Sequence, residues 1–373
     1  MAQPSREPST SWISWLLGCF FDTLAGLLMR LLLGKDHRFF ADGYGDLARC
    51  EELEGMVDKG IDVAFPDIHH MEWEDDTHGL EQQGEVSVRN ASFASPCGAF
   101  TCEESKTAYV QVVAPAGGRH VRGVVIHLPQ TGDMGYGFRR KTLGIPLALE
   151  GYASIILVGP YYGKRKPRSQ RRHYVRNVAE YLISASTTFT EAAKLVKWAQ
   201  QEWPDTHVCL SGISYGGAMA ACAASILPAS VAAGGVAVAP CVSSSSPKAI
   251  VGGLLVSQID WQTLMEEKSH TRQQAYDHLS EILAARDLRE LIHHTHTNAH
   301  VHVQGLKCVV TTASHDRFVV RSDGLALIKE LVRMCGTVEE VWLEGGHVSS
   351  IARCTRVFVP SIRRAFQLMD GKT

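Results

Sequence analysis

The chain has 373 residues, of which 45% are hydrophobic and 20% charged, and its formal net charge is −2. This composition is typical of an ordinary globular protein, and the near-zero charge gives no whole-chain field that would favour nucleic acid. A chain of this length can form one large α/β domain with an N-terminal extension. Its ten cysteines are scattered without paired C-x-x-C units, which favours buried free thiols in a reducing, intracellular compartment.

Residues 11–34 are the clear membrane candidate in the sequence. Asp22 and Arg30 interrupt this apolar stretch, and the cost of inserting two charges roughly balances the gain from its Leu, Ile and Phe residues. A narrow stripe of small or polar residues also recurs every four positions: Ser14, Gly18, Asp22, Gly26 and Arg30. For residues 1–34 we therefore expect a helix that spans or lies on a membrane or docks on the rest of the protein, with a targeting segment as the remaining alternative.

Residues 35–85 are polar and weakly periodic, and we interpret them as a helical linker. From residue 86 onward the pattern becomes an alternation of strands and helices. Strands are predicted at 86–95, 108–115, 122–129, 152–160, 207–213, 232–239, 307–313 and 338–344. Helices are predicted between most of them, at 139–150, 176–201, 215–227, 322–335 and 349–368.

This βαβ succession predicts an α/β fold over residues 86–373. We expect a mostly parallel eight-stranded sheet that opens with an antiparallel hairpin and carries helices on both faces. Residues 243–304 interrupt the alternation with a long insertion whose apolar residues have helical spacing. We expect this insertion to form a helical cap.

The turn Gly212-Ile213-Ser214-Tyr215-Gly216 falls between a short apolar strand and an Ala-rich helix. A serine in such a strand-to-helix turn is held in a strained, exposed position, where its hydroxyl can attack a substrate and the helix N-terminus favours a developing oxyanion. The context indicates that Ser214 is a nucleophile rather than a chance match to the pattern.

A serine hydroxyl needs a base, and a histidine base needs an acid that orients it. Asp316 follows the strand at 307–313, and His347 follows the strand at 338–344. Both therefore lie in loops beyond strand ends, in the order serine, acid, histidine that α/β-hydrolases use. The sequence predicts a triad of Ser214, Asp316 and His347 in an α/β-hydrolase fold.

The oxyanion hole of such a site takes one N–H from the residue after the nucleophile, here Tyr215. The second comes from the loop after the strand at 122–129. Pro129 has no N–H to donate, so we expect Gln130 or Thr131 to serve.

A basic run follows the strand at 152–160, at the same sheet edge as Ser214. It contains Lys164, Arg165, Lys166, Arg168, Arg171 and Arg172. A solvated surface, a nucleic-acid or nuclear-localisation signal, and an anion site are the alternatives. For the anion site we expect Arg165, Lys166 and Arg168 to bind a phospholipid headgroup while its ester reaches Ser214.

A histidine cluster near the end of the insertion is the one pattern that invites a metal interpretation. It comprises His293, His294, His296, His300 and His302. No acidic or cysteine ligand accompanies it at a recognisable spacing, so we predict no metal site.

Several of these segments resemble the α/β-hydrolase domain-containing protein 18 family. The resemblance covers roughly residues 90–360 and is carried by His127-Leu128 with Thr131-Gly132-Asp133, the run 160–170, the elbow 212–217, and Gly345-Gly346-His347-Val348. The run Pro160-Tyr161-Tyr162-Gly163-Lys164-Arg165-Lys166-Pro167 is the most specific of them. The resemblance implies the same triad, no cofactor, and an acyl-lipid substrate, with a mitochondrial phospholipid among the candidates.

The sequence therefore predicts a carboxylesterase-like or lipase-like serine hydrolase, intracellular and associated with a membrane surface, in which mitochondria are one candidate compartment. No nucleic-acid partner is expected. An inactive scaffold that binds lipid or protein, and an acyltransferase that uses the same acyl-enzyme, remain as alternatives. The acyl chain, the headgroup and the oligomeric state are not encoded in any pattern that we can interpret.

Overall fold

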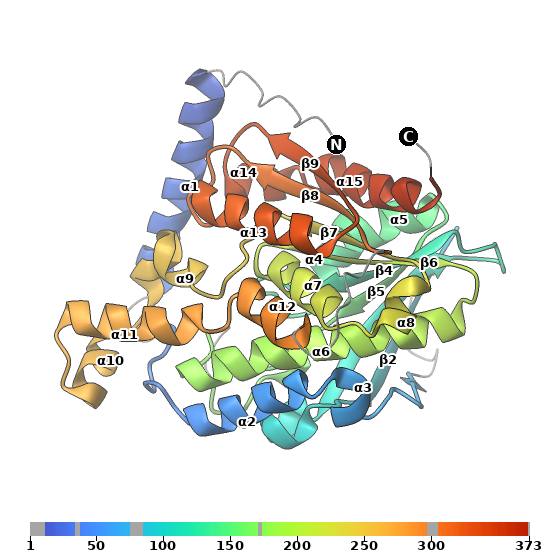
Figure 1. The fold of residues 1–373 in the computed structure, drawn as a ribbon. Coiled ribbons are helices and arrows are strands. Elements are labelled where there is room, and N and C mark those ends of the chain that lie inside the picture. The colour runs from blue at the N-terminus through green and yellow to red at the C-terminus, as the bar shows by residue number, and fades with distance from the viewer. Residues whose placement is uncertain (1–11, 34–37, 75–84, 171–173, 297–304, 372–373) are drawn as a thin grey trace.

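A computed structural model describes residues 12–33, 38–74, 85–170, 174–296 and 305–371. Its centre is a nine-stranded sheet with the order β1-β2-β3-β5-β4-β6-β7-β8-β9 (Figure 1). The strands are β1 Glu72–Trp73, β2 Val86–Ala94, β3 Thr107–Pro115, β4 Gly123–Leu128, β5 Ala153–Leu157, β6 His207–Ile213, β7 Val236–Cys241, β8 Lys307–Ala313 and β9 Thr337–Leu343.

The direction of the strands follows the prediction. β2 and β3 form an antiparallel hairpin, β3 also pairs antiparallel with β5, and every pair from β5 to β9 is parallel. All residues of β4, β5 and β7 are buried, because a parallel sheet is covered on both faces and its strands are apolar runs. The mostly parallel sheet is confirmed. The structure adds the short strand β1 at the edge, where it pairs with β2.

Helices cover both faces of the sheet, as expected (Figure 1). Buried apolar side chains of α6 Val178–Glu202, α7 Tyr215–Ser225 and α13 Arg321–Met334 belong to one hydrophobic cluster. Those of α5 Ile145–Leu149 and α15 Cys354–Met369 contribute to a second hydrophobic cluster. The shorter elements are η2 Gly98–Phe100, η3 Glu103–Ser105, α4 Gly137–Arg139, the π-turn η4 Arg140–Gly144, η5 Gly163–Arg165 and α8 Ala229–Ala233. α8 takes the place of the first residues of the strand predicted at 232–239.

The segment 35–85, interpreted as a linker, packs closely on the sheet domain. Helix α2 Leu47–Asp58 lies along α6, and its side chains Cys50, Leu53 and Val57 are buried in the same core cluster. The short helix α3 Ile61–Ala64 follows. Residues 75–84 lie outside the described part.

Between β7 and β8 the chain forms the predicted helical insertion. Its elements are α9 Ala249–Gly252, η6 Leu254–Gln258, α10 Trp261–Lys268, α11 Arg272–Ala284 and α12 Leu288–His296. α12 contacts α7, α13 and α2, so the insertion packs against the helix that follows Ser214.

Helix α1 Trp12–Leu33 lies against the insertion and against helix α14 His347–Ala352 (Figure 1). The predicted stripe of small and polar residues faces inward, since Gly18, Asp22 and Gly26 are buried; the side chains of Ser14 and Arg30 lie outside the described residues. In the described part of the chain, no helix combines the length and apolar character needed to cross a bilayer.

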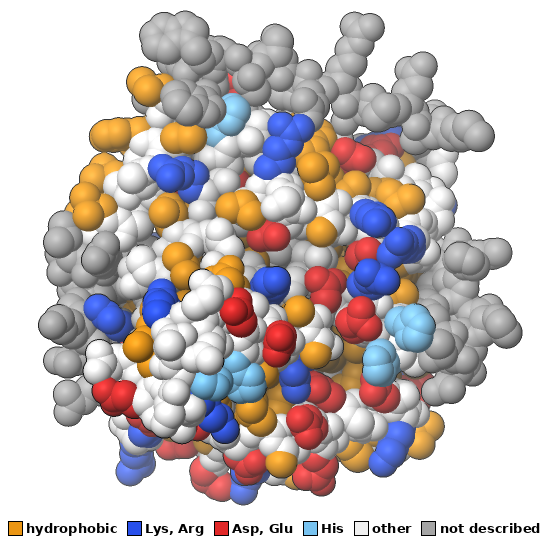
Figure 2. Space-filling view, turned by 60° about the vertical axis from the view of Figure 1, so that its left-hand side comes forward, with side chains coloured by type: hydrophobic (Ala, Val, Ile, Leu, Met, Phe, Trp, Pro, Cys, Tyr) orange, Lys and Arg blue, Asp and Glu red, His pale blue; other side chains and the backbone are white. Residues whose placement is uncertain are grey.

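The opposite side of α1 is apolar and exposed. Its exposed side chains include Leu16, Phe20, Phe21, Leu24, Leu27 and Leu28. Figure 2 brings this side of the molecule forward and shows hydrophobic side chains gathered at the upper left, whereas acidic and basic side chains are mixed over the lower half.

Candidate active site

Ser214 lies in the turn that joins β6 to α7. Its φ of +55° and ψ of −123° place it in a region that non-glycine residues rarely adopt. A Cβ at Gly212 would lie 2.3 Å from the backbone of Gly216, and a Cβ at Gly216 would lie 2.5 Å from the carbonyl oxygen of Leu128. Both glycines are therefore required by close backbone packing. The strand-to-helix context predicted for this turn is confirmed.

The loops after β8 and β9 bring Asp316 and His347 together. The Nδ1 atom of His347 lies 2.6 Å from Oδ2 of Asp316. The other carboxylate oxygen, Oδ1, accepts hydrogen bonds of 2.8 Å from the N–H groups of Phe318 and Val319. Because Nδ1–H is donated to Asp316, Nε2 of His347 is left to accept a proton.

Ser214 and His347 line one pocket, which we call the Ser214 pocket. It encloses about 1030 Å³ of empty space, part of it open to solvent. Tyr215, Gln130 and Thr131 line it as well. The structure thus brings the predicted nucleophile, base and oxyanion donors to one place, with Asp316 directly behind the base.

The rest of the Ser214 pocket is mostly apolar. Its apolar lining residues are Ala25, Tyr181, Ala218, Met219, Pro247, Ala249, Ile250, Leu255, Phe318, Val319, Val348 and Ile351. They come from α1, α6, α7, the insertion, the loop of Asp316 and helix α14. A pocket of this character favours a substrate with an apolar part near its reactive group.

A buried arginine, Arg139, stabilises the loop that carries Gln130 and Thr131 through hydrogen bonds. Arg139 donates from Nε to Asp133 at 2.7 Å, from Nη1 to the carbonyl oxygen of His127 at 2.7 Å, and from Nη2 to that of Gly135 at 3.0 Å. Only 2% of Arg139 is exposed. The guanidinium fork therefore fixes the loop on both sides of its tip, and sequence reasoning had not singled this residue out.

A second residue to which the sequence assigned no role at this site is Asp22 of α1, which is fully buried. Its Oδ2 accepts hydrogen bonds from the N–H groups of Arg317 at 3.0 Å and His347 at 2.9 Å, and its Oδ1 accepts one from Val348 at 2.8 Å. One carboxylate thus binds the loop of the acid and the first turn of α14, where the base lies.

The approach of α1 to these loops depends on a small residue one turn earlier. A Cβ at Gly18 would lie 2.7 Å from the nitrogen of Gly346 and 2.8 Å from the carbonyl carbon of Gly345. Gly18 and Asp22 both belong to the stripe with four-residue spacing, which was the signal for them in the sequence. A carboxylate in an otherwise apolar helix also needs a partner if it is to be buried.

The surroundings of His347 alter its acidity. Burial lowers the pKa of His347, but the negative charges of Asp316 and Asp22 and the hydrogen bond to Asp316 outweigh that effect and raise the pKa above its ordinary value. His127, at the end of β4, behaves differently, since burial lowers its pKa to about 3 and it stays neutral near pH 7. Of these two histidines, His347 is therefore the one whose pKa favours taking up a proton.

In the basic run after β5, the structure contradicts the role predicted for one residue of the anion site. Arg165 is fully buried, and its guanidinium donates to both carboxylate oxygens of Glu191, at 2.6 and 2.8 Å, and to the carbonyl oxygens of Val158 and Ser105. This corrects the prediction for Arg165, which joins the loop to α6 and has no free face for a headgroup. Lys166 is half-buried and Arg168 exposed, and neither is in the described lining of the Ser214 pocket; Arg171 and Arg172 lie outside the described residues.

Arg165→Lys is expected to lower the free energy of unfolding by roughly 2 kcal/mol, because the ammonium keeps the charge but loses the planar fork that makes these hydrogen bonds. Urea or thermal unfolding of the purified protein measures the change. Arg168→Gln, at an exposed position, serves as the control and should stay within about 0.5 kcal/mol of the wild type. Equal unfolding midpoints for the two variants would contradict the structural role of Arg165.

The histidine cluster lies partly outside the described residues, which exclude His300 and His302 and the side chain of His296. His294 of α12 lies 3.5 Å from a carboxylate oxygen of Asp58. Within the described part of the chain, no group of three or more His, Cys, Asp or Glu side chains has the geometry to hold a metal ion. All ten cysteines are free thiols and most are buried.

The sequence also matches a known family. A family model described as alpha/beta hydrolase domain containing 18 matches residues 37–298 and 270–368, most of the chain. The chain therefore belongs to this family. In this member of the alpha/beta hydrolase domain containing 18 family, the segments that carried the resemblance have structural roles: Asp133 binds Arg139, and Arg165 of the most specific run binds Glu191.

Solved structures of similar fold include two acetyl xylan esterases. The enzyme from Paenibacillus sp. R4 is 12% identical, with a TM-score of 0.51 over 87% of this chain and 98% of its own. Acetyl xylan esterase 1 from Thermoanaerobacterium sp. JW/SL YS485 is 11% identical, with a TM-score of 0.53 over 87% of this chain and 96% of its own. At these identities the comparison establishes the α/β-hydrolase fold of this family member and nothing finer.

Proposed function

We propose that the chain is a serine hydrolase that cleaves carboxylic esters through an acyl-enzyme on Ser214. The observation that carries the proposal is the shared pocket of a strained Ser214 and of His347, whose Nδ1 is 2.6 Å from Asp316. A hydroxyl beside such a histidine gains a base, and the base has its tautomer held by the carboxylate behind it.

In the proposed reaction, Nε2 of His347 takes the proton of Ser214 as Oγ attacks the ester carbonyl carbon. The oxyanion receives N–H groups from Tyr215, at the first turn of α7, and from Gln130 or Thr131. His347 then protonates the departing alcohol, and the C–O bond of the ester breaks. Water attacks the acyl-enzyme by the same route, releasing the carboxylic acid and restoring the serine.

We further propose that the substrate is the ester of an acyl lipid. The apolar lining of the Ser214 pocket supports this choice, because methylene groups gain free energy by leaving water for such a surface. α1 contributes Ala25 to the pocket and carries exposed Leu and Phe side chains on its other side, which is favourable for taking a substrate from a membrane surface. The two similar solved structures are themselves esterases by name.

Labelling with a fluorophosphonate probe tests the proposal. The wild-type protein should be labelled, the labelled peptide should contain Ser214, and the same preparation should hydrolyse p-nitrophenyl esters. Ser214→Ala should lose both the label and the hydrolysis, since it removes the attacking oxygen. Ser257→Ala, which removes an exposed hydroxyl from the insertion, is the control. A folded wild-type protein that resists the probe and the esters would favour an inactive scaffold instead.

A further inference from the structure

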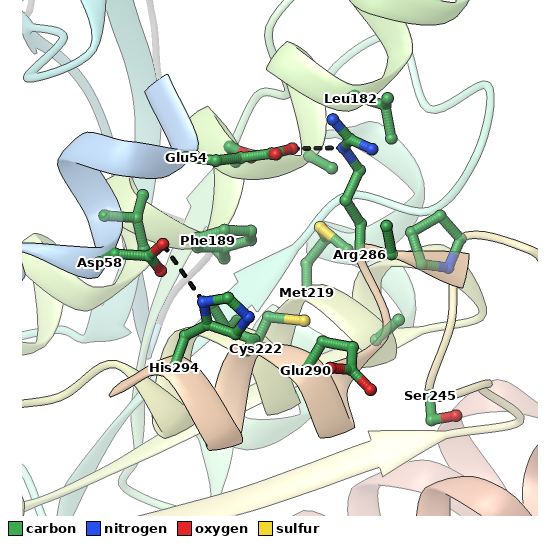
Figure 3. A pocket seen from close by; sticks show the side chains of 17 residues that line it. Glu54, Asp58, Leu182, Phe189, Met219, Cys222, Ser245, Arg286, Glu290 and His294 are labelled. Atoms are coloured by element: carbon green, nitrogen blue, oxygen red, sulfur yellow. Dashed lines mark hydrogen bonds and ion pairs between the residues drawn. The ribbon is translucent and has the colours of Figure 1, made fainter. Parts of the chain in front are cut away.

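A second pocket lies beside the Ser214 pocket, and we call it the distal pocket (Figure 3). It has about 740 Å³ of empty space, part of it open to solvent, between α2, α6, α7 and the insertion. Its apolar walls include Leu182 and Phe189 of α6, Met219 of α7 and Leu291 of α12. A space with such walls favours an apolar occupant over a charged or strongly hydrated one.

The two pockets share a wall. Ala218, Met219 and Pro247 line both of them. Met219 is buried between the two spaces, and an unbranched methionine side chain can change rotamer to join them. The distal pocket is therefore a continuation of the Ser214 pocket along α7 rather than an unrelated surface hollow.

The path between them follows one face of α7. Ser214 caps this helix, and Ala218 and Cys222 follow at intervals of four residues, so that the three lie on the same face. Only small side chains stand along this line. At the usual rise of a helix, Cys222 is about 12 Å from Ser214, a span that roughly ten carbons of an extended acyl chain would cover.

Four of the charged or titratable side chains that line the distal pocket lie in pairs, and Glu290 lines it as well. Glu54 of α2 forms an ion pair with Arg286, and Asp58 of α2 lies 3.5 Å from His294 of α12 (Figure 3). These two contacts connect α2 to the insertion across the pocket. On the side formed by α7, the pocket is lined by Ala218, Met219 and Cys222.

We propose that the distal pocket holds the end of a linear acyl chain whose ester carbonyl lies at Ser214. This inference rests on the proposed function and names its substrate class: esters of acyl chains longer than about ten carbons. The chain runs from the serine past Ala218 and Met219 and ends beside Phe189 and Leu291. Short acyl groups react without reaching this pocket.

The test measures kcat/KM for p-nitrophenyl butyrate, octanoate, laurate and palmitate. In the wild type, kcat/KM should rise roughly fourfold for each methylene that becomes buried, up to the length of the pocket. Cys222→Phe fills the pocket from its middle and should lower the ratio of laurate to butyrate hydrolysis by about tenfold or more. Ala218 lies one helical turn closer to Ser214. Ala218→Phe should therefore limit hydrolysis to shorter acyl chains than Cys222→Phe does, so that kcat/KM for octanoate falls as well.

The ratio between substrates is measured within one preparation, so it does not depend on how much of a variant folds. Leu291→Trp narrows the same pocket from α12 and gives an independent variant, with the same expected fall for laurate. Unchanged chain-length profiles in Cys222→Phe and Leu291→Trp, with fluorophosphonate labelling intact, would overturn the acyl-chain assignment and leave the hydrolase proposal standing. A wild type that neither hydrolyses any of the esters nor reacts with the probe would overturn the proposed function, and this inference with it.

Discussion

Asp316→Asn is expected to lower kcat for ester hydrolysis by roughly ten-thousand-fold while the protein stays folded. The amide oxygen of asparagine can keep the two hydrogen bonds from the N–H groups of Phe318 and Val319. Its NH₂ group then faces Nδ1 of His347 and demands an acceptor there. His347 must therefore carry its proton on Nε2, where it blocks the transfer from Ser214.

Steady-state hydrolysis of p-nitrophenyl butyrate measures this loss, and circular dichroism checks the fold. Asp277→Asn is the matched control, since Asp277 is an exposed residue of helix α11 and belongs to neither catalytic loop. A variant at Asp316 that retained kcat within tenfold of the wild type would show that another group orients the histidine.

Asp22→Asn should lower kcat by about 10- to 100-fold, the equivalent of one lost charge-assisted hydrogen bond. The carboxylate accepts from three backbone N–H groups through two oxygens. Asparagine offers a single oxygen, so at least one N–H meets an NH₂ group instead. The loops of Asp316 and His347 then lose their common anchor, although Asp22 contacts neither Ser214 nor any reacting atom.

The pH profile separates this role from a general loss of stability. Asp22 contributes to the raised pKa of His347, and the imidazole must be neutral to act as a base, so activity falls as pH decreases through that pKa. Removing the negative charge lowers the pKa of His347. The acid limb of kcat/KM should therefore move to lower pH in Asp22→Asn, a shift that a merely less stable protein would not show.

Two further variants strengthen the test of Asp22. Gly18→Val introduces a side chain whose Cβ alone would lie within 3 Å of the Gly345–Gly346 backbone, so it should displace α1 and also lower kcat. Leu27→Ser changes the exposed side of α1 and should leave hydrolysis of a soluble short ester unaffected. If Asp22→Asn kept both kcat and the position of the acid limb, the anchoring role would be wrong.

Much of the fold was predictable because its signals are local. The strands from β2 to β9 are apolar runs bounded by turns, and each was expected within a few residues of its observed position. The order of Ser214, Asp316 and His347 was predictable for the same reason, since the end of a parallel strand places the next residues at one edge of the sheet. The strand β1 was missed, because two residues carry no periodicity.

The charged residues were harder to interpret. Arg165 lies in a run of six basic residues, and nothing in that run distinguishes a surface charge from a buried one. Its partner Glu191 lies 26 residues further on, in the middle of α6. A buried ion pair is a property of two elements that meet in space, so single-element patterns do not reveal it.

In the N-terminal helix, too, some features follow from the sequence and others only from the packing of the folded chain. Its apolar character and its small, polar stripe are properties of one helix, and the sequence by itself determined both, together with the identities and order of the serine, the acid and the histidine. Which surface the stripe would meet was decided by the tertiary structure alone, which places Asp22 on the backbone of residues more than 290 positions away. The reason is physical: periodicity is set by the geometry of a single helix or strand, whereas hydrogen-bond partners and pockets depend on how those elements pack.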